Sequence, residues 1–181
     1  MHDWREYDQN PVSHSAAHHL VAIAELIEKY GYARVVDVAS ELGITRGSVS
    51  VTLKGLKSRG LVTEDERRHL GLSEEGARIA RGVMAKKSVL MGLFTDLLGV
   101  PADQADQDTC KIEHLVSDET AERVSRALLF LRSGAKEAEE FIAALREFGR
   151  SGDAESFPSE EVEALARELD RGVEGKEGES R

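Results

Sequence analysis

Hydrophobic residues recur at intervals of three and four through most of the chain, which is the spacing of an amphipathic helix. The pattern predicts helices over residues 14–30, 36–42, 46–58, 73–98, 110–116, 119–131, 136–148 and 159–169. Two short segments, 61–64 and 70–72, predict strands on either side of a charged turn. Residues 101–108 predict an acidic turn or a short helix, and the glycine- and charge-rich residues 172–181 predict disorder. The fold class is therefore mostly α.

Three residues mark a helix-turn-helix inside this pattern. Ala39, Gly43 and Val49 fall at offsets 0, 4 and 10 across the second and third predicted helices. The small residue lets two helices approach, the glycine makes the turn, and the β-branched residue packs the second helix on the first. A plain helical hairpin is the alternative.

The two predicted strands directly follow the third helix, and Arg67 and Arg68 lie in the turn between them. Strand, charged turn and strand after a recognition-type helix is the order of a winged helix-turn-helix, in which both arginines would lie on the wing. An ordinary solvated hairpin is the alternative for these two residues. Residues 32–35 are too short to assign and predict a small strand or a capping segment.

The net charge of −10 argues against binding to nucleic acid, but the distribution of the charges along the chain matters more than their sum. Residues 135–181 hold 14 acidic and 7 basic residues, whereas residues 44–60 hold four bases and no acid. A locally basic helix in an acidic protein can still approach phosphates. The order of the elements and the charge distribution predict three parts: a winged helix-turn-helix domain at 1–80, a helical metal-binding and dimerisation domain at 81–150, and an acidic helix and tail at 151–181.

The remaining bulk properties of the sequence bear on the cellular compartment in which the protein is expected. The hydrophobic content of 40% is enough for a core, and a single cysteine excludes an internal disulfide framework. The start of the chain lacks the apolar segment of a signal peptide, and no stretch reaches the 18 apolar residues of a membrane span. We therefore expect a soluble cytoplasmic protein without a membrane partner.

Candidate chemistry lies in the run Cys110-Lys111-Ile112-Glu113-His114. On a helix, the first, fourth and fifth of these residues share one face, so a thiolate, a carboxylate and an imidazole would converge. Such a mixture suits a transition metal. A buried cysteine beside a surface Glu-His pair is the alternative. A second imidazole cluster, His14, His18 and His19, begins the first helix, and taken alone it indicates a solvated helix start.

With these features in place, the chain resembles the diphtheria toxin repressor family of metal-dependent transcriptional regulators, which includes a manganese-responsive branch. The resemblance spans about residues 18–131. The matching runs are Gly31 to Ala39, Ser48 to Ser50, Leu72 to Gly76, Leu98 to Val100 and Cys110 to Asp118. It implies a homodimer with two winged helix-turn-helix domains and an all-helical metal-binding and dimerisation domain. The end of the chain lacks the pattern of an SH3-like third domain, which favours the shorter, two-domain branch.

The resemblance also implies a ligand set. The matching positions are His18, Cys110, Glu113 and His114. An ancillary site of the family falls on Lys87, Met91 and Asp106, so we expect that second site to be absent or rebuilt. We expect Lys87 to be simply solvated, and a fixed ammonium in the place of a cation is the alternative. Two imidazoles, one thiolate and one carboxylate make a soft site, which favours Fe(II) or Zn(II), with Mn(II) possible as the third choice.

The implied function is a metal-dependent repressor of metal-homeostasis genes that binds a palindromic double-stranded DNA operator. Base and phosphate contacts would come from the recognition helix, and phosphate contacts from the wing. The expected DNA-binding residues are Thr45, Arg46, Ser48, Ser50, Val51, Lys54, Arg67 and Arg68.

Three alternatives remain at this point. One is a winged-helix regulator that has lost metal sensing. Another is an enzyme with Cys110 as nucleophile and His114 as base, although no oxyanion-hole motif accompanies the pair. The third is a helical interaction protein whose acidic tail binds a partner.

Overall fold

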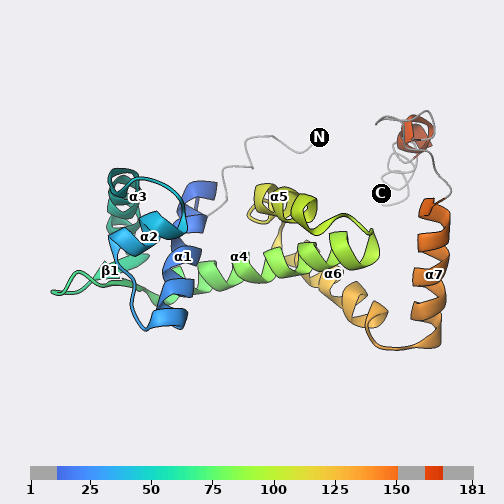
Figure 1. The fold of residues 1–181 in the computed structure, drawn as a ribbon, viewed down its shortest axis with the longest axis horizontal. Helices are drawn as coiled ribbons and strands as arrows, with labels where there is room; N and C mark the ends of the chain where they lie inside the picture. The colour runs from blue at the N-terminus through green and yellow to red at the C-terminus, as the bar shows by residue number, and fades with distance from the viewer. Residues whose placement is uncertain (1–11, 151–161, 169–181) are drawn as a thin grey trace, which may run out of the picture. The chain divides into compact units, whose positions relative to one another are not determined.

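The computed structural model describes residues 12–150 and 162–168. The chain divides into two compact units, with the boundary between Ala138 and Glu139 in the sequence. The helices are α1 (His14–Tyr30), α2 (Val35–Glu41), α3 (Arg46–Ser58), α4 (Glu74–Gly92), the π-helix η2 (Leu93–Leu97), α5 (Ala102–Ile112), α6 (Asp118–Leu131) and α7 (Lys136–Arg150). The strands are β1 (Val62–Glu64) and β2 (Leu70–Leu72) (Figure 1). The mostly helical fold class is confirmed. Residues 162–168 are also helical, while the predicted disordered tail at 172–181 lies outside the described residues.

One predicted boundary is wrong. Residues 101–108 and 110–116 do not form separate elements, because α5 runs without a break from Ala102 to Ile112. Ala105 and Thr109 lie one turn apart and are both buried, so packing carries the helix through its acidic stretch. The helix ends early because Ser117 caps the next one by accepting a hydrogen bond from the Thr120 N–H.

The helix-turn-helix is present in α2 and α3. Gly43 has a φ of +64°, a left-handed conformation that suits glycine at the turn. Ala39 and Val49 are buried where the two helices meet. Thr45 caps α3 by accepting a hydrogen bond from the Ser48 N–H at 3.1 Å. The plain hairpin is therefore excluded.

The wing is a two-stranded antiparallel ribbon in which Val62 pairs with Leu72 and Glu64 with Leu70. A bridge between Ala33 and Leu70 joins it to the segment before α2, which settles the ambiguous residues 32–35. The winged helix-turn-helix predicted from the order of elements is confirmed.

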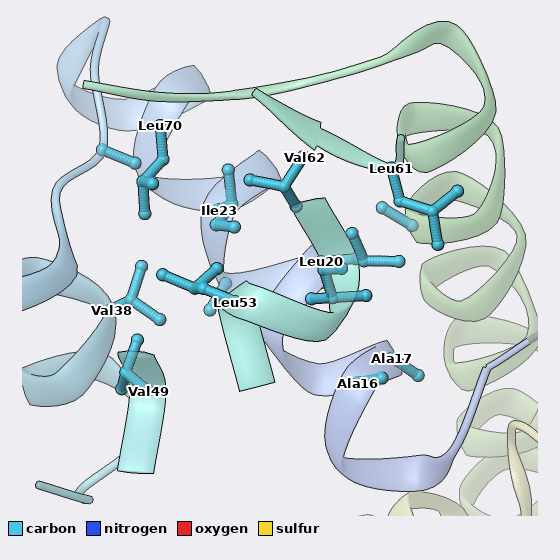
Figure 2. Packing of buried hydrophobic residues seen from close by; sticks show 14 of the residues in the cluster. Ala16, Ala17, Leu20, Ile23, Val38, Val49, Leu53, Leu61, Val62 and Leu70 are labelled. Carbon is cyan, nitrogen blue, oxygen red and sulfur yellow. The ribbon is translucent and has the colours of Figure 1, made fainter. Parts of the chain in front are cut away.

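The core of this half forms around α1. Leu20 and Ile23 are fully buried, and Figure 2 shows side chains from α1, α2, α3 and the wing turned toward one interior, with Leu53 of α3 close to both. Fully burying an aliphatic side chain of this size contributes about 1.5–3 kcal/mol. The start of α1, where the histidines lie, is thereby held in a fixed direction.

Helix α4 connects the two halves of the first unit. It packs on α1 and β2 near its beginning and on α5 and α6 further along (Figure 1). Since α4 is continuous through residue 80, the domain division at that residue stays a prediction. No helix in the described ranges is both long enough and apolar enough to cross a membrane.

Candidate metal centre and nucleic-acid interface

The first turn and a half of α1 carries three histidines with different surroundings. Ser13 caps the helix, and its side chain accepts a hydrogen bond from the Ala16 N–H at 3.3 Å. His14 is exposed and His18 is half-buried on the same face. His19 points into the core, is 2% exposed, and lies with Nδ1 2.6 Å from the Ser15 carbonyl oxygen. Only His14 and His18 are therefore available to a ligand.

The opposing residues lie at the end of α5. Cys110 is within the last turn, and Glu113 is the C-cap, with its N–H donating to the Thr109 carbonyl at 2.8 Å. His114 follows in the turn beyond the helix. The predicted shared helical face therefore holds for Cys110 and Glu113, whereas the chain has left the helix at His114.

Side chains from α1 and α5 meet directly. His18 Nε2 lies 3.4 Å from Cys110 Sγ and 3.7 Å from Glu113 Oε1. His114 Nδ1 lies 3.2 Å from His14 Nδ1. The four residues predicted as ligands are thus brought into one neighbourhood, with His14 between His18 and His114.

The Glu113 carboxylate is the least exposed part of this group. The residue is 2% exposed, and its Oε2 has no hydrogen-bond partner among the described residues. Burial raises the pKa of the Glu113 carboxyl above its usual range, while the nearby Lys87 ammonium opposes the rise. A buried oxygen without a partner is costly in a folded protein, and a bound cation would satisfy it.

The pKa values of the neighbouring groups shift in the directions that burial causes. Burial lowers the pKa of His18, and the imidazole of His14 and the ammonium of Lys87 lower it further. Burial also lowers the pKa of His114, with His14 again adding to the effect. Neutral imidazoles are the form that binds metals. The pKa of the Cys110 thiol is raised by burial and by Glu113, so a metal would have to displace its proton.

The ancillary positions form a contact of their own. Lys87 Nζ of α4 lies 2.9 Å from Asp106 Oδ1 of α5, and this carboxylate raises the pKa of the lysine. The expectation that Lys87 is simply solvated is therefore wrong: the ammonium is paired because α5 places Asp106, one turn before Cys110, against α4. The side chains at two of the expected ancillary positions therefore form an ion pair with each other.

The surface of α3 carries most of the predicted DNA-binding residues. Val51 is 76% exposed, which leaves it open to a partner. Arg46 and Lys54 are exposed and form no ion pair within the described part of the chain. The hydroxyls are less free than predicted, since Ser50 donates to the Arg46 carbonyl at 2.8 Å and Ser48 lies 2.9 Å from the Thr45 hydroxyl.

The wing presents its two arginines differently. Arg67 and Arg68 are both exposed, but Arg68 lies with Nη1 3.3 Å from Glu64 Oε1. Arg68 also has a φ of +66°, a left-handed conformation at the tip of the ribbon. Glu64 is further bonded to Lys57 of α3. The pair of predicted phosphate contacts is therefore unequal, with Arg67 the more available.

The base of the wing contains a network that the sequence reasoning missed. His69 Nδ1 lies 3.1 Å from Asp65 Oδ2, and its Nε2 lies 3.0 Å from Arg34 Nη2. Asp65 also accepts hydrogen bonds from the N–H groups of Arg67 and His69. The Asp-x-x-x-His spacing in a polar turn is the signal that could have revealed it, because aspartate often bonds the backbone just after it.

Parts of this chain are similar to known proteins. Residues 73–144 match the family model of the iron dependent repressor, metal binding and dimerisation domain. The chain therefore carries, in this part, a domain of the iron dependent repressor type. It is 35% identical over 98 residues to the transcriptional regulator MntR of Escherichia coli O6:H1, which covers 54% of this chain and 63% of MntR. It is 30% identical over 91 residues to the iron-dependent repressor IdeR of Mycobacterium bovis, covering 50% of this chain and 40% of IdeR.

Two solved structures share the fold over part of this chain. The crystal structure of IdeR from T. acidophilum superposes with a TM-score of 0.54 at 27% identity, over 61% of this chain and 52% of that one. The manganese regulator SloR superposes with a TM-score of 0.58 at 25% identity, over 62% and 53%. The chain thus spans between about two fifths and just under two thirds of the length of these relatives.

Proposed function

We propose that this protein is a metal-dependent DNA-binding transcriptional regulator, acting as a homodimeric repressor of metal-homeostasis genes at a palindromic operator. The observation that carries the proposal is the meeting of His18, on the first helix of the winged helix-turn-helix, with Cys110 and Glu113 at the end of α5. These donors come from the two halves of the first unit, so a ligand shared between them would affect how the halves move.

The donor set fits a divalent transition metal. The site residues would be His18, Cys110, Glu113 and His114, which together supply nitrogen, sulfur and oxygen. An imidazole nitrogen and a thiolate sulfur bound to the same zinc ion lie about 2.0–2.3 Å from it, so atoms already 3.4–3.7 Å apart need only small movements. Soft and borderline donors favour Fe(II) or Zn(II) over Mn(II). The relatives differ in the metal their names carry, since SloR is a manganese regulator and IdeR is iron-dependent.

A bound ion would supply a crosslink between α1 and α5. The chain's own residues determine what that crosslink changes. Because α1 is packed through Leu20 and Ile23 against the helix-turn-helix, restraining His18 restrains the direction of α3. A dimer reads two half-sites separated by about one helical turn of DNA or a multiple of it, so the spacing of its two recognition helices decides affinity. A 100-fold gain in operator affinity corresponds to only about 2.7 kcal/mol of coupling.

The exposed face of α3 would enter the major groove. Arg46 near its start suits a guanine or a phosphate, and the exposed Val51 suits a thymine methyl group. The acceptor lone pairs of Thr45, Ser48 and Ser50 remain available for donors on base edges. Lys54, Arg67 and Arg68 would contact phosphates, with Arg68 first having to leave Glu64.

A homodimer accounts for apolar surface on the helical half. Leu129 and Phe130 of α6 are 69% and 52% exposed, although large apolar side chains next to each other are usually covered. The family model that matches this part of the chain is a metal binding and dimerisation domain. A two-fold partner would cover the same residues on both subunits.

The test begins with selection of DNA from a random pool, once with Zn(II) or Fe(II) and once with a chelator. Binding of the selected DNA is then measured by fluorescence anisotropy for the wild type, His18→Ala and Cys110→Ala. We expect metal to strengthen wild-type binding about 100-fold and to have no effect on either variant. Lys111→Ala is the matched control, since this exposed neighbour on α5 pairs with Asp108.

Two outcomes would contradict the proposal. Equal DNA binding with metal and with chelator would favour the alternative, a winged-helix regulator without metal sensing. Failure to select any DNA would contradict the proposal that the protein is a DNA-binding regulator.

A further inference from the structure

His14 is the one side chain in the cluster that the predicted ligand set leaves out. It is the first residue of α1 and lies one turn before His18, with the two rings 4.4 Å apart. Its ring centroid is also 4.5 Å from that of His114. His14, His18 and Cys110 each offer one metal-binding atom, and these three atoms all lie within 4.8 Å of one another.

The contact between His14 and His114 is unusual for two surface side chains. Their Nδ1 atoms are 3.2 Å apart, which requires one ring to donate and the other to accept. Two protonated rings would repel each other at this distance. No apolar packing explains the arrangement, because His14 is exposed. One shared proton holds the two Nδ1 atoms together, and a metal ion that replaced this proton would take a lone pair from each ring.

Two of the distances in the cluster match those between donors that share one ion. Two nitrogens bound to the same zinc at about 2.0–2.1 Å lie roughly 3–3.5 Å apart in tetrahedral or octahedral arrangements. The His14–His114 separation of 3.2 Å falls in this range, and the His18–Cys110 separation of 3.4 Å is close to it. The unpartnered, buried Oε2 of Glu113 is an independent sign that the neighbourhood is built for a cation.

We infer that His14 is an additional ligand of the metal centre, which then holds three imidazoles, one thiolate and one carboxylate. The inference rests on the proposed metal site and narrows its specificity. His14 and His18 are four residues apart on one helix face, a spacing by which two imidazoles can bind one zinc ion. The added nitrogen shifts the site toward Co(II), Ni(II) and Zn(II) and away from Mn(II), which prefers oxygen ligands.

The placement of His14 adds a structural consequence. Ser13 already caps α1 through the Ala16 N–H. Binding through His14 would fasten the first turn of the helix in addition to its second turn. The beginning of α1 would then become ordered together with the metal centre.

Co(II) titration of the full-length protein, followed by its optical absorption, tests this directly. Thiolate charge-transfer bands report Cys110, and the ligand-field bands intensify as the number of ligands falls. We expect His14→Ala to weaken Co(II) binding at least about tenfold, no less than the loss of an outer-shell partner costs. Its ligand-field spectrum should change while the thiolate band persists. Competition with Mn(II) should show that the preference for Co(II) over Mn(II) falls by a similar factor.

His69→Ala is the matched control, because His69 lies at the base of the wing and away from the cluster. It should reproduce the wild-type titration. His14→Gln supplies a second variant, and circular dichroism of each metal-free protein verifies that the helices are intact. Unchanged affinity and spectrum in both His14 variants would overturn the inference while leaving the other ligands in place. A wild-type protein that binds neither Co(II) nor Zn(II) would instead overturn the proposed metal site itself.

Discussion

Replacing Glu113 by methionine should stabilise the metal-free protein and remove most of the stabilisation that a bound metal gives. Glu113 is 2% exposed, and its Oε2 is unpartnered in the described part of the chain. Its contact with His18, at 3.7 Å, stabilises the carboxylate little, because burial lowers the pKa of that imidazole and so favours its neutral form. The carboxylate is thus costly to the fold until a cation is present.

The magnitude follows from the burial. A buried polar atom without a partner costs about 1–3 kcal/mol, and apolar replacement of buried charges often stabilises by a similar amount. Glu113→Met should therefore raise the free energy of unfolding by about 1–3 kcal/mol in the presence of a chelator. At a Zn(II) concentration 100 times its Kd, the wild type gains about 2.7 kcal/mol, and the variant should gain far less.

Urea denaturation followed by circular dichroism measures both values, once in chelator and once in Zn(II). Glu119→Met is the control, because Glu119 is an exposed member of a surface ion pair with Arg123, and it should keep the wild-type response to metal. A variant that is less stable than wild type in chelator would show that the carboxylate supports the metal-free fold. A variant that gains as much from Zn(II) as wild type would show that Glu113 is not a ligand.

Three further predictions concern the winged helix-turn-helix. Gly76→Ala should destabilise the protein by about 1–3 kcal/mol, because a Cβ there would collide with the Leu61 carbonyl; Gly82→Ala, where nothing lies within 4 Å, should be neutral or stabilising in the same thermal melt. Val51→Ser should leave unfolding unchanged within about 0.5 kcal/mol yet relax base preference at one position of the selected DNA, and an unchanged preference would remove Val51 from the interface. Arg67→Ala should weaken binding to all DNA sequences and reduce the salt slope by about 1, whereas an unaltered slope would place the wing away from phosphates.

The helical framework was predictable because each element carries its own local signals. Ser13, Thr45, Ser73 and Ser117 all act as N-caps, and each precedes a run of helical periodicity. The turn at Gly43 needed a left-handed residue and was found from its spacing alone. These features depend on neighbours in sequence, which is why they could be read without a structure.

The end of α5 was less predictable, since it depends on packing. Acidic residues made 101–108 look like a turn, but burial of Ala105 and Thr109 overrides their weak helix propensity. The early end of the helix moves His114 off the face that Cys110 and Glu113 share. The Ser117 cap was a local signal for the start of the next helix, but it did not show where α5 ends.

The candidate site shows the same division. Cys110, Glu113 and His18 were found from ligand chemistry and from resemblance, and the structure brings them together. The His14–His114 contact and the Lys87–Asp106 ion pair join residues distant in sequence, so only the packing of α1, α4 and α5 reveals them. Pairs of this kind have no periodicity that a single sequence can display.

The central claim is that one metal ion joins the DNA-binding half to the helical half through side chains of both. Crystals grown with Zn(II) and measured across the zinc absorption edge would test it most directly. We expect an anomalous peak about 2.0–2.3 Å from both a His18 nitrogen and the Cys110 sulfur. A peak bound by residues of only one half, or the absence of any peak between α1 and α5, would contradict it.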